Sequence, residues 1–118
     1  MDSTPQKLLR YIAPGKIFVF STTYCPYCVK AKNLLKDNGI KYGTVEIDND
    51  PEIAEDEEFV QALEKHSGIS TYPKVYIGLS CVGGYTDLYK LYQSMVLFRM
   101  LTKEGIAFKD QDKFNSKY

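Results

Sequence analysis

Two cysteines separated by two residues are the part of this sequence best suited to do chemistry. They lie in the segment STTYCPYC, residues 21–28. A cysteine pair at this spacing, between a predicted strand and a predicted helix, forms a dithiol that a fold can oxidise and reduce. Cys25 falls at the N-cap of the helix and Pro26 at its first position, where the missing N–H of proline costs nothing. The segment therefore predicts thiol–disulfide chemistry.

The start of a helix favours ionisation of Cys25. The N–H groups of Tyr27 and Cys28 have no partner within the helix, so we expect them to point toward the Cys25 sulfur. A free thiol with a pKa of about 8.5 is only about 3% thiolate at pH 7. The helix dipole contributes at most about 2 kcal/mol, or roughly 1.5 pKa units, and hydrogen bonds to the sulfur lower the pKa further. We expect Cys25 to be the exposed nucleophile and Cys28, facing inward, to resolve a mixed disulfide.

Two other interpretations of the cysteines stay open. The pair can be a packing accident, or Cys25 and Cys28 can join Cys81 and His66 in a zinc site. Structural zinc sites usually take their ligands as two close pairs, and neither Cys81 nor His66 has a close companion in the sequence. We therefore expect no metal site, and interpret Cys81 as a small buried hydrophobe and His66 as a helix-end residue.

Changes of hydrophobic periodicity predict the elements that position the cysteine pair. Residues 17–20 are an uninterrupted apolar, β-rich run, typical of a buried central strand. Residues 26–38 form the helix that carries the pair, and Gly39 follows its end. Its expected inward side chains are Val29, Ala31, Leu34 and Leu35. Residues 41–47 indicate a second strand.

The second half of the chain adds two short strands and several helices. Residues 51–65 predict an acidic helix that starts at Pro51, and residues 74–77 predict a third strand. A fourth strand ends at the pair Gly83-Gly84, and it must be antiparallel because so short a connection cannot return in parallel. Further helices are expected at residues 4–14, where Thr4 is the cap, at 87–93 and at 94–103. We predict an α/β fold, a four-stranded mixed sheet flanked by helices on both faces.

Length and composition restrict the class of protein. The 118 residues argue for a single domain, with a core at about 16–106, a helical extension at 1–15 and a polar, loosely held tail at 109–118. Fifteen basic residues balance fifteen acidic ones, which disfavours nucleic acid as a partner. No apolar run approaches the ~20 residues that span a bilayer. Three cysteines are too few for a disulfide-stapled secreted scaffold, so we expect a reducing, cytoplasmic setting.

Three motifs occur in order over residues 16–106. They are Cys25-Pro26-Tyr27-Cys28, then Thr71-Tyr72-Pro73, then Gly83-Gly84-Tyr85-Thr86-Asp87. Together they resemble the dithiol glutaredoxin family, whose second and third motifs are Thr-Val-Pro and Gly-Gly-X-(Ser/Asp/Thr)-Asp. Thioredoxins share the fold but typically carry Trp-Cys-Gly-Pro-Cys, and this chain has no tryptophan. The resemblance implies a thioredoxin-like fold and a glutathione-dependent thiol–disulfide oxidoreductase.

The resemblance also implies how glutathione is bound. Pro73 is then cis, and the main chain of Tyr72 pairs with the cysteinyl part of glutathione. The full set of expected glutathione contacts is Tyr27, Thr71, Tyr72, Pro73, Gly84, Tyr85, Thr86 and Asp87. Gly84 to Asp87 would take the γ-glutamyl end, and Tyr27 the region near the glycine end. Simpler interpretations are a trans Pro73 that opens a strand, and Thr86 and Asp87 that only cap a helix.

Two positions depart from the family pattern. Thr22 stands where the family usually has a lysine that attracts the glycine carboxylate of glutathione. We therefore expect weaker glutathione binding here, unless Lys16 or Lys30 substitutes. The family often places Gln or Arg thirteen residues before the cis proline, where this chain has Val60 followed by Gln61, so neither is assigned as a contact.

The predicted reaction is reduction of glutathione mixed disulfides by Cys25 and of protein disulfides by Cys25 together with Cys28. Expected partners are glutathione and proteins that are glutathionylated or contain disulfides, and we expect a monomer with no permanently bound cofactor. One alternative is a binding role, in which two chains bridge an iron–sulfur cluster through Cys25 and glutathione, although Pro26 suits this less than serine or glycine. Another is an inert interaction module, because fold alone does not establish activity.

Overall fold

The protein folds as one four-stranded sheet with helices on both faces. The computed structural model describes residues 3–117. The elements in chain order are α1 (Thr4–Leu8), β1 (Ile17–Ser21), α2 (Pro26–Asp37), β2 (Gly43–Glu46), α3 (Glu57–Ser67), β3 (Lys74–Ile77), β4 (Ser80–Gly83), α4 (Tyr85–Gln93), α5 (Val96–Glu104) and α6 (Gln111–Lys117). The order of strands in the sheet is β2-β1-β3-β4. β1 and β2 are parallel, whereas β3 is antiparallel to both β1 and β4. The predicted mixed sheet and the antiparallel last strands are confirmed.

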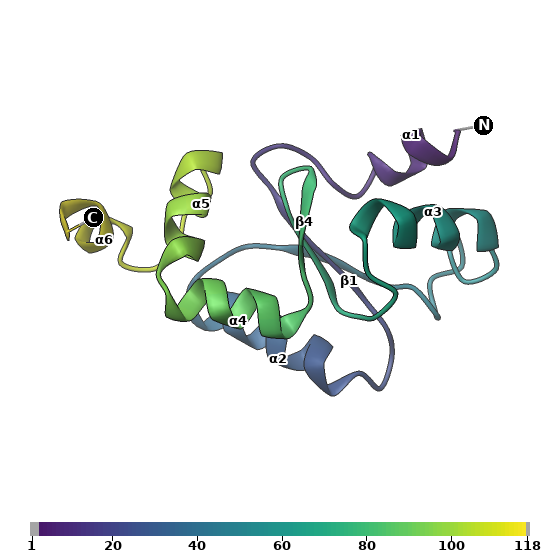
Figure 1. The fold of residues 1–118 in the computed structure, drawn as a ribbon, viewed down its shortest axis with the longest axis horizontal. Coiled ribbons are helices and arrows are strands. Elements are labelled where there is room, and N and C mark those ends of the chain that lie inside the picture. The colour runs from purple at the N-terminus through teal and green to yellow at the C-terminus, as the bar shows by residue number, and fades with distance from the viewer. Residues whose placement is uncertain (1–2, 118) are drawn as a thin grey trace.

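Alternating side chains of the central strand divide the core between two layers. Ile17 and Val19 face the layer that contains α2, α4 and α5, where Leu35 and Leu88 are fully buried. Phe20 faces the opposite layer, which α1 and α3 cover (Figure 1). A strand buried on both faces reads as a continuous apolar run, because successive side chains point to opposite sides. The ends of β1 and β3 that carry the functional loops are therefore held in a sheet covered from both sides.

Several predicted boundaries are wrong, and each error has a local cause. The first helix ends at Leu8 rather than near residue 14, and Ser3 rather than Thr4 is its N-cap. The acidic helix begins at Glu57, not at Pro51, because residues 51–55 form turns and the Asp56 carboxylate caps the helix by accepting from the Phe59 N–H.

Two predictions of burial also fail. Val29 is 55% exposed rather than inward, because the buried stripe of α2 runs through Cys28, Ala31 and Leu35. The tail at 109–118 is not loosely held over its described part, since residues 111–117 form α6 and Phe114 is buried.

Candidate active site

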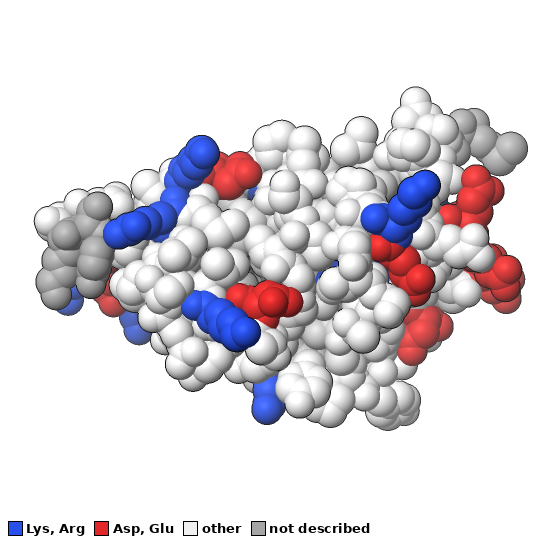
Figure 2. Space-filling model, in the orientation of Figure 1, with Lys and Arg blue, Asp and Glu red and all other residues white. Residues whose placement is uncertain are grey.

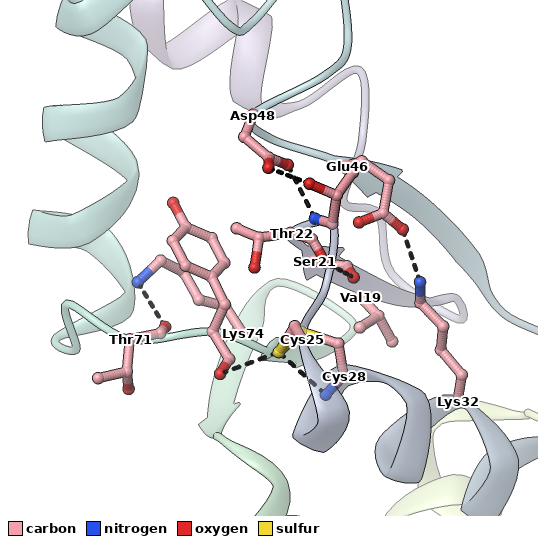
Figure 3. The surroundings of a disulfide bond; sticks show 12 residues. Val19, Ser21, Thr22, Cys25, Cys28, Lys32, Glu46, Asp48, Thr71 and Lys74 are labelled. Atoms are coloured by element: carbon pink, nitrogen blue, oxygen red, sulfur yellow. Dashed lines mark hydrogen bonds and ion pairs between the residues drawn. A yellow bond between two sulfur atoms is a disulfide. The ribbon is translucent and has the colours of Figure 1, made fainter.

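The cysteine pair lies where β1 leads into α2. Cys25 is the N-cap of the helix, and its Sγ accepts a hydrogen bond from the Cys28 N–H at 3.2 Å (Figure 3). The expected second donor, the Tyr27 N–H, forms no hydrogen bond to this sulfur among the described residues. Cys25 is half-exposed and Cys28 is buried, as predicted for an attacking and a resolving thiol. A disulfide joins the two sulfurs, so the structure represents the oxidised form of the pair.

The loop before Cys25 is held by an aspartate from the neighbouring strand. Asp48 follows β2, and its carboxylate accepts hydrogen bonds from the Thr23 hydroxyl and from the Thr23 N–H, the latter at 2.9 Å (Figure 3). These hydrogen bonds hold the pKa of Asp48 below its usual range, because they stabilise the charged carboxylate. The sequence indicates Asp48 only as a turn residue. Its contact with Thr23 exists because β2 pairs with β1 in parallel.

A second segment approaches the sulfurs from β3. The Tyr72–Pro73 peptide bond is cis, which confirms the expectation drawn from the resemblance. The carbonyl oxygen of Tyr72 lies 3.8 Å from the Cys25 Sγ. The Tyr72 N–H has no hydrogen-bond partner among residues 3–117, and the neighbouring Thr71 is exposed. The main chain of Tyr72 is thus available for strand-like pairing directly beside Cys25.

A buried lysine, which no sequence motif indicates, supports this segment. Lys74 is fully buried, and its Nζ donates hydrogen bonds to the carbonyl oxygens of Ile69 and Thr71, the second of which is drawn in Figure 3. The ammonium also lies 4.5 Å from the centre of the Tyr72 ring. Burial lowers the pKa of Lys74, because the charged form loses its hydration. Lys74 therefore fixes the loop that presents Thr71 and Tyr72 to the sulfurs.

The third motif forms the start of α4. Gly84 is the N-cap, and its N–H donates to the Asp87 carboxylate at 3.1 Å. Gly83 has a φ of 119°, and a Cβ there would lie 2.2 Å from the Asp87 Oδ2, so a side chain at this position would displace the carboxylate. Asp87 thus caps the start of α4, whereas Thr86 is exposed and makes no cap hydrogen bond. Whether both contact glutathione stays a prediction.

Tyrosines surround the exposed side of the pair. Tyr27 is 57% exposed, and its ring centre lies 6.1 Å from that of Tyr85. Tyr24 adopts a left-handed backbone conformation, with a φ of 56°, and its side chain stands fully in solvent. A hollow of about 640 Å³ beside Cys25 and Cys28 is also lined by Lys32 and Glu46, which form an ion pair with Nζ and Oε1 2.7 Å apart.

The remaining candidate residues lie apart from the sulfurs or have structural contacts. His66 shares a hydrogen bond of 2.8 Å with the Tyr76 hydroxyl, and Cys81 is a half-buried free thiol whose pKa is raised by burial. Within residues 3–117, no group of three or more His, Cys, Asp or Glu side chains is arranged to hold a metal ion. No helix in this range has both the length and the apolar character that a membrane crossing requires.

Comparison with known proteins agrees with the geometry. The glutaredoxin family model matches residues 17–82. The chain is 37% identical over 94 residues to glutaredoxin-1 from Homo sapiens, which is 80% of this chain and 89% of that protein. It is 34% identical over 100 residues to glutaredoxin-C2 from Arabidopsis thaliana, covering 85% of this chain and 87% of the relative.

Solved structures show the same relationship. A buckwheat glutaredoxin in complex with glutathione superimposes with a TM-score of 0.76 and 31% identity, over 86% of this chain and 90% of that one. The α/β fold with its four-stranded mixed sheet is therefore the thioredoxin-like fold that the motifs predicted. The family match covers both cysteines and the Tyr72–Pro73 segment. This chain belongs to the glutaredoxin family of thiol–disulfide oxidoreductases.

Proposed function

We propose that this protein uses glutathione as its co-substrate and that Cys25 is the nucleophile. The observation that carries the proposal is the position of the Cys25 Sγ, at the N-cap of α2 and 3.8 Å from the Tyr72 carbonyl. Helix N-termini favour a thiolate, and an extended main chain beside it can orient a tripeptide thiol. Glutathione is also the ligand of the similar buckwheat glutaredoxin.

The reaction proceeds by two displacements at sulfur. The Cys25 thiolate attacks the glutathione sulfur of a mixed disulfide, so that a Cys25–glutathione disulfide forms and the substrate thiolate leaves and takes up a proton. The thiolate of a second glutathione then attacks the glutathione sulfur of this adduct. Glutathione disulfide is released and the Cys25 thiolate is regenerated, which balances the two electrons.

Protein disulfides follow a dithiol route. Cys25 attacks one sulfur of the substrate disulfide, and the Cys28 thiolate then attacks the Cys25 Sγ of the mixed disulfide. The reduced protein leaves and the Cys25–Cys28 disulfide forms. The disulfide between these two cysteines supports this route, because it is present in a structure in which α2 is a regular helix from Pro26 to Asp37.

The proposed glutathione site extends from Tyr72 to the start of α4. The N–H and carbonyl of Tyr72 would pair with the cysteinyl unit, beside Thr71 and Pro73. The γ-glutamyl carboxylate would lie at the N-terminus of α4, near Gly84, Tyr85 and Thr86, where main-chain N–H groups favour an anion. Asp87 would receive the γ-glutamyl ammonium, and Tyr27 would contact the region near the glycine end. We further propose action in a reducing compartment such as the cytoplasm, on glutathionylated or disulfide-containing proteins, as a monomer.

The test is turnover of the mixed disulfide of glutathione and 2-mercaptoethanol, coupled to glutathione reductase. We expect Cys25→Ser to abolish turnover and Cys28→Ser to retain it, because only the dithiol route needs Cys28. Cys81→Ser is the control and should behave like the wild type, since this thiol is half-buried and unpaired. Substantial turnover by Cys25→Ser would refute the assignment of the nucleophile.

A further inference from the structure

Four tyrosines form a continuous row that leads away from the cysteine pair. Tyr27 comes from α2, and Tyr85, Tyr89 and Tyr92 come from α4, which packs beside α2 (Figure 1). Successive ring centres are 6.1, 5.8 and 6.1 Å apart. We call these four residues the tyrosine ladder. It spans about five residues of extended peptide, at roughly 3.3 Å for each residue.

The ladder begins within the active-site motif. Tyr27 lies between Cys25 and Cys28 in the sequence and is 57% exposed, and Tyr89, two rings along, is 38% exposed. A polypeptide joined to Cys25 through a disulfide has to leave the sulfur over the surface around it. Tyr27 and Tyr89 offer exposed aromatic surface along one such path, whereas Tyr85 and Tyr92 are partly buried and pack against the core. Tyrosine is well suited to contact with a partner, because it buries much area at a small cost in side-chain entropy.

A lysine adds positive charge to the same surface. The Nζ of Lys30 lies 5.3 Å from the centre of the Tyr27 ring and 5.9 Å from that of Tyr85. No acidic side chain forms an ion pair with Lys30 in the part of the chain that the structure describes. Asp87, near the start of α4, is already engaged by the Gly84 N–H. Most of the acidic side chains visible on the face drawn in Figure 2 lie at its α3 end.

We propose that the tyrosine ladder binds the polypeptide segment next to the reacting cysteine of a protein substrate. The preferred segment is extended, with an apolar or aromatic side chain on Tyr89 and a carboxylate paired with Lys30. This chemistry follows from the exposed rings of Tyr27 and Tyr89 and from a cation that lacks an acidic partner within the described residues. The proposal rests on the proposed function and names the kind of substrate that the same site prefers.

The test compares three substrates of the wild type. Two are peptides of equal length that carry one disulfide bond and a phenylalanine near the reacting cysteine, one with aspartates and one with lysines around it, so that Cys25 attacks a sulfur of the peptide itself. The third is the mixed disulfide of glutathione and 2-mercaptoethanol, which reports the active site without any peptide. We expect kcat/KM to be higher for the acidic peptide than for the basic peptide at low ionic strength, and the difference to shrink in 0.5 M salt.

Two substitutions test whether Lys30 and Tyr89 cause the preference for the acidic peptide and the contact with its side chains. Lys30→Glu should change the ratio of kcat/KM for the acidic and basic peptides by about tenfold, because an attraction becomes a repulsion at an exposed site. Lys36→Glu, at an exposed position of the same helix, is the matched control. Tyr89→Ala should lower kcat/KM about threefold for both peptides and leave the small substrate unaffected, with Leu9→Ala, at the exposed C-cap of α1, as its control.

Each contrary result has a distinct meaning. Equal kcat/KM values for the two peptides in the wild type, with normal turnover of the small substrate, would overturn the ladder proposal alone. The proposal would also be overturned if Lys30→Glu left the ratio of kcat/KM for the acidic and basic peptides unchanged. It would be overturned as well if Lys30→Glu changed the KM of the small substrate as much as that of the peptides, because Lys30 would then act on glutathione. If the wild type were a dimer and Tyr89→Ala dissociated it, the tyrosine ladder would bind a second copy of this chain, and the proposal would be overturned. Failure of the wild type to turn over the small substrate would refute the proposed function itself.

Discussion

Phe114 provides a test of how firmly the C-terminal segment belongs to the folded core. Its ring centre lies 5.7 Å from that of Phe98 on α5 and 5.6 Å from that of Phe108, and the side chain is only 9% exposed. The Lys109 N–H donates to the Asn38 carbonyl at 2.8 Å, which ties the start of this segment to the end of α2. We predict that Phe114→Ala destabilises the protein without changing its activity.

The magnitude follows from burial and position. Phe→Ala in a fully buried core costs about 3–5 kcal/mol. Phe114 lies on the last helix, and α6 can detach from the core instead of leaving a cavity there. The loss in free energy of unfolding therefore cannot exceed the free energy with which α6 docks on the core. We expect a decrease of about 2–3 kcal/mol in the free energy of unfolding. A chain of this size loses roughly 4 °C in Tm for each kcal/mol, so Tm should fall by about 10 °C.

Urea unfolding followed by far-UV circular dichroism is the suitable assay, because the chain has no tryptophan to report by fluorescence. Lys113→Ala is the matched control, since it places alanine at an exposed neighbouring position of the same helix. Surface substitutions of this kind stay within about 0.5 kcal/mol. If Phe114→Ala were no more destabilising than Lys113→Ala, docking of α6 would be refuted. Turnover should be equal in both, because α6 lies at one end of the molecule, away from the start of α2 (Figure 1).

Three further predictions concern the active site. Asp48→Asn should lower the free energy of unfolding, because it removes the carboxylate that accepts hydrogen bonds from Thr23. The folded pKa of Asp48 is lowered, so the difference in stability from the wild type should be present at pH 7 and vanish as the pH falls through that pKa. Urea unfolding at several pH values measures this difference. Gly83→Ala should raise the KM for glutathione and lower Tm, because its Cβ displaces Asp87 from the start of α4. Thr22→Lys should lower the KM for glutathione at low ionic strength by adding a charge for the glycine carboxylate.

Each has an outcome that would contradict it. A destabilisation by Asp48→Asn that persists unchanged at pH 2 would show that the carboxylate charge is not what anchors Thr23. Wild-type KM and Tm for Gly83→Ala would mean that the loop around Gly83 adapts without moving Asp87. An unchanged KM in Thr22→Lys would show that this position is not near the glycine end of glutathione.

The elements that carry the chemistry were readable from local patterns. The apolar run of β1, the proline after Cys25 and the glycine after α2 set that strand and that helix to within a residue or two of the observed bounds. Errors occur where local signals compete. Pro51 and five acidic residues favour a helix start, yet Ile53 is fully buried in a turn and Asp56 supplies the actual cap. A proline marks where a helix is able to begin, and packing decides whether it does.

The amino-acid sequence by itself determined the chemistry of this protein, because the spacing of Cys25 and Cys28 across one helical turn is a local property of the chain. Only the tertiary structure decided what surrounds the sulfurs. Asp48 reaches Thr23 and the Tyr72 carbonyl reaches Cys25 across 25 and 47 positions of sequence. Lys74 is a charged residue that periodicity alone would place in solvent. Such contacts depend on the register of the sheet and on how the helices cross. No single segment of the sequence determines either, so the contacts form only when the strands pair.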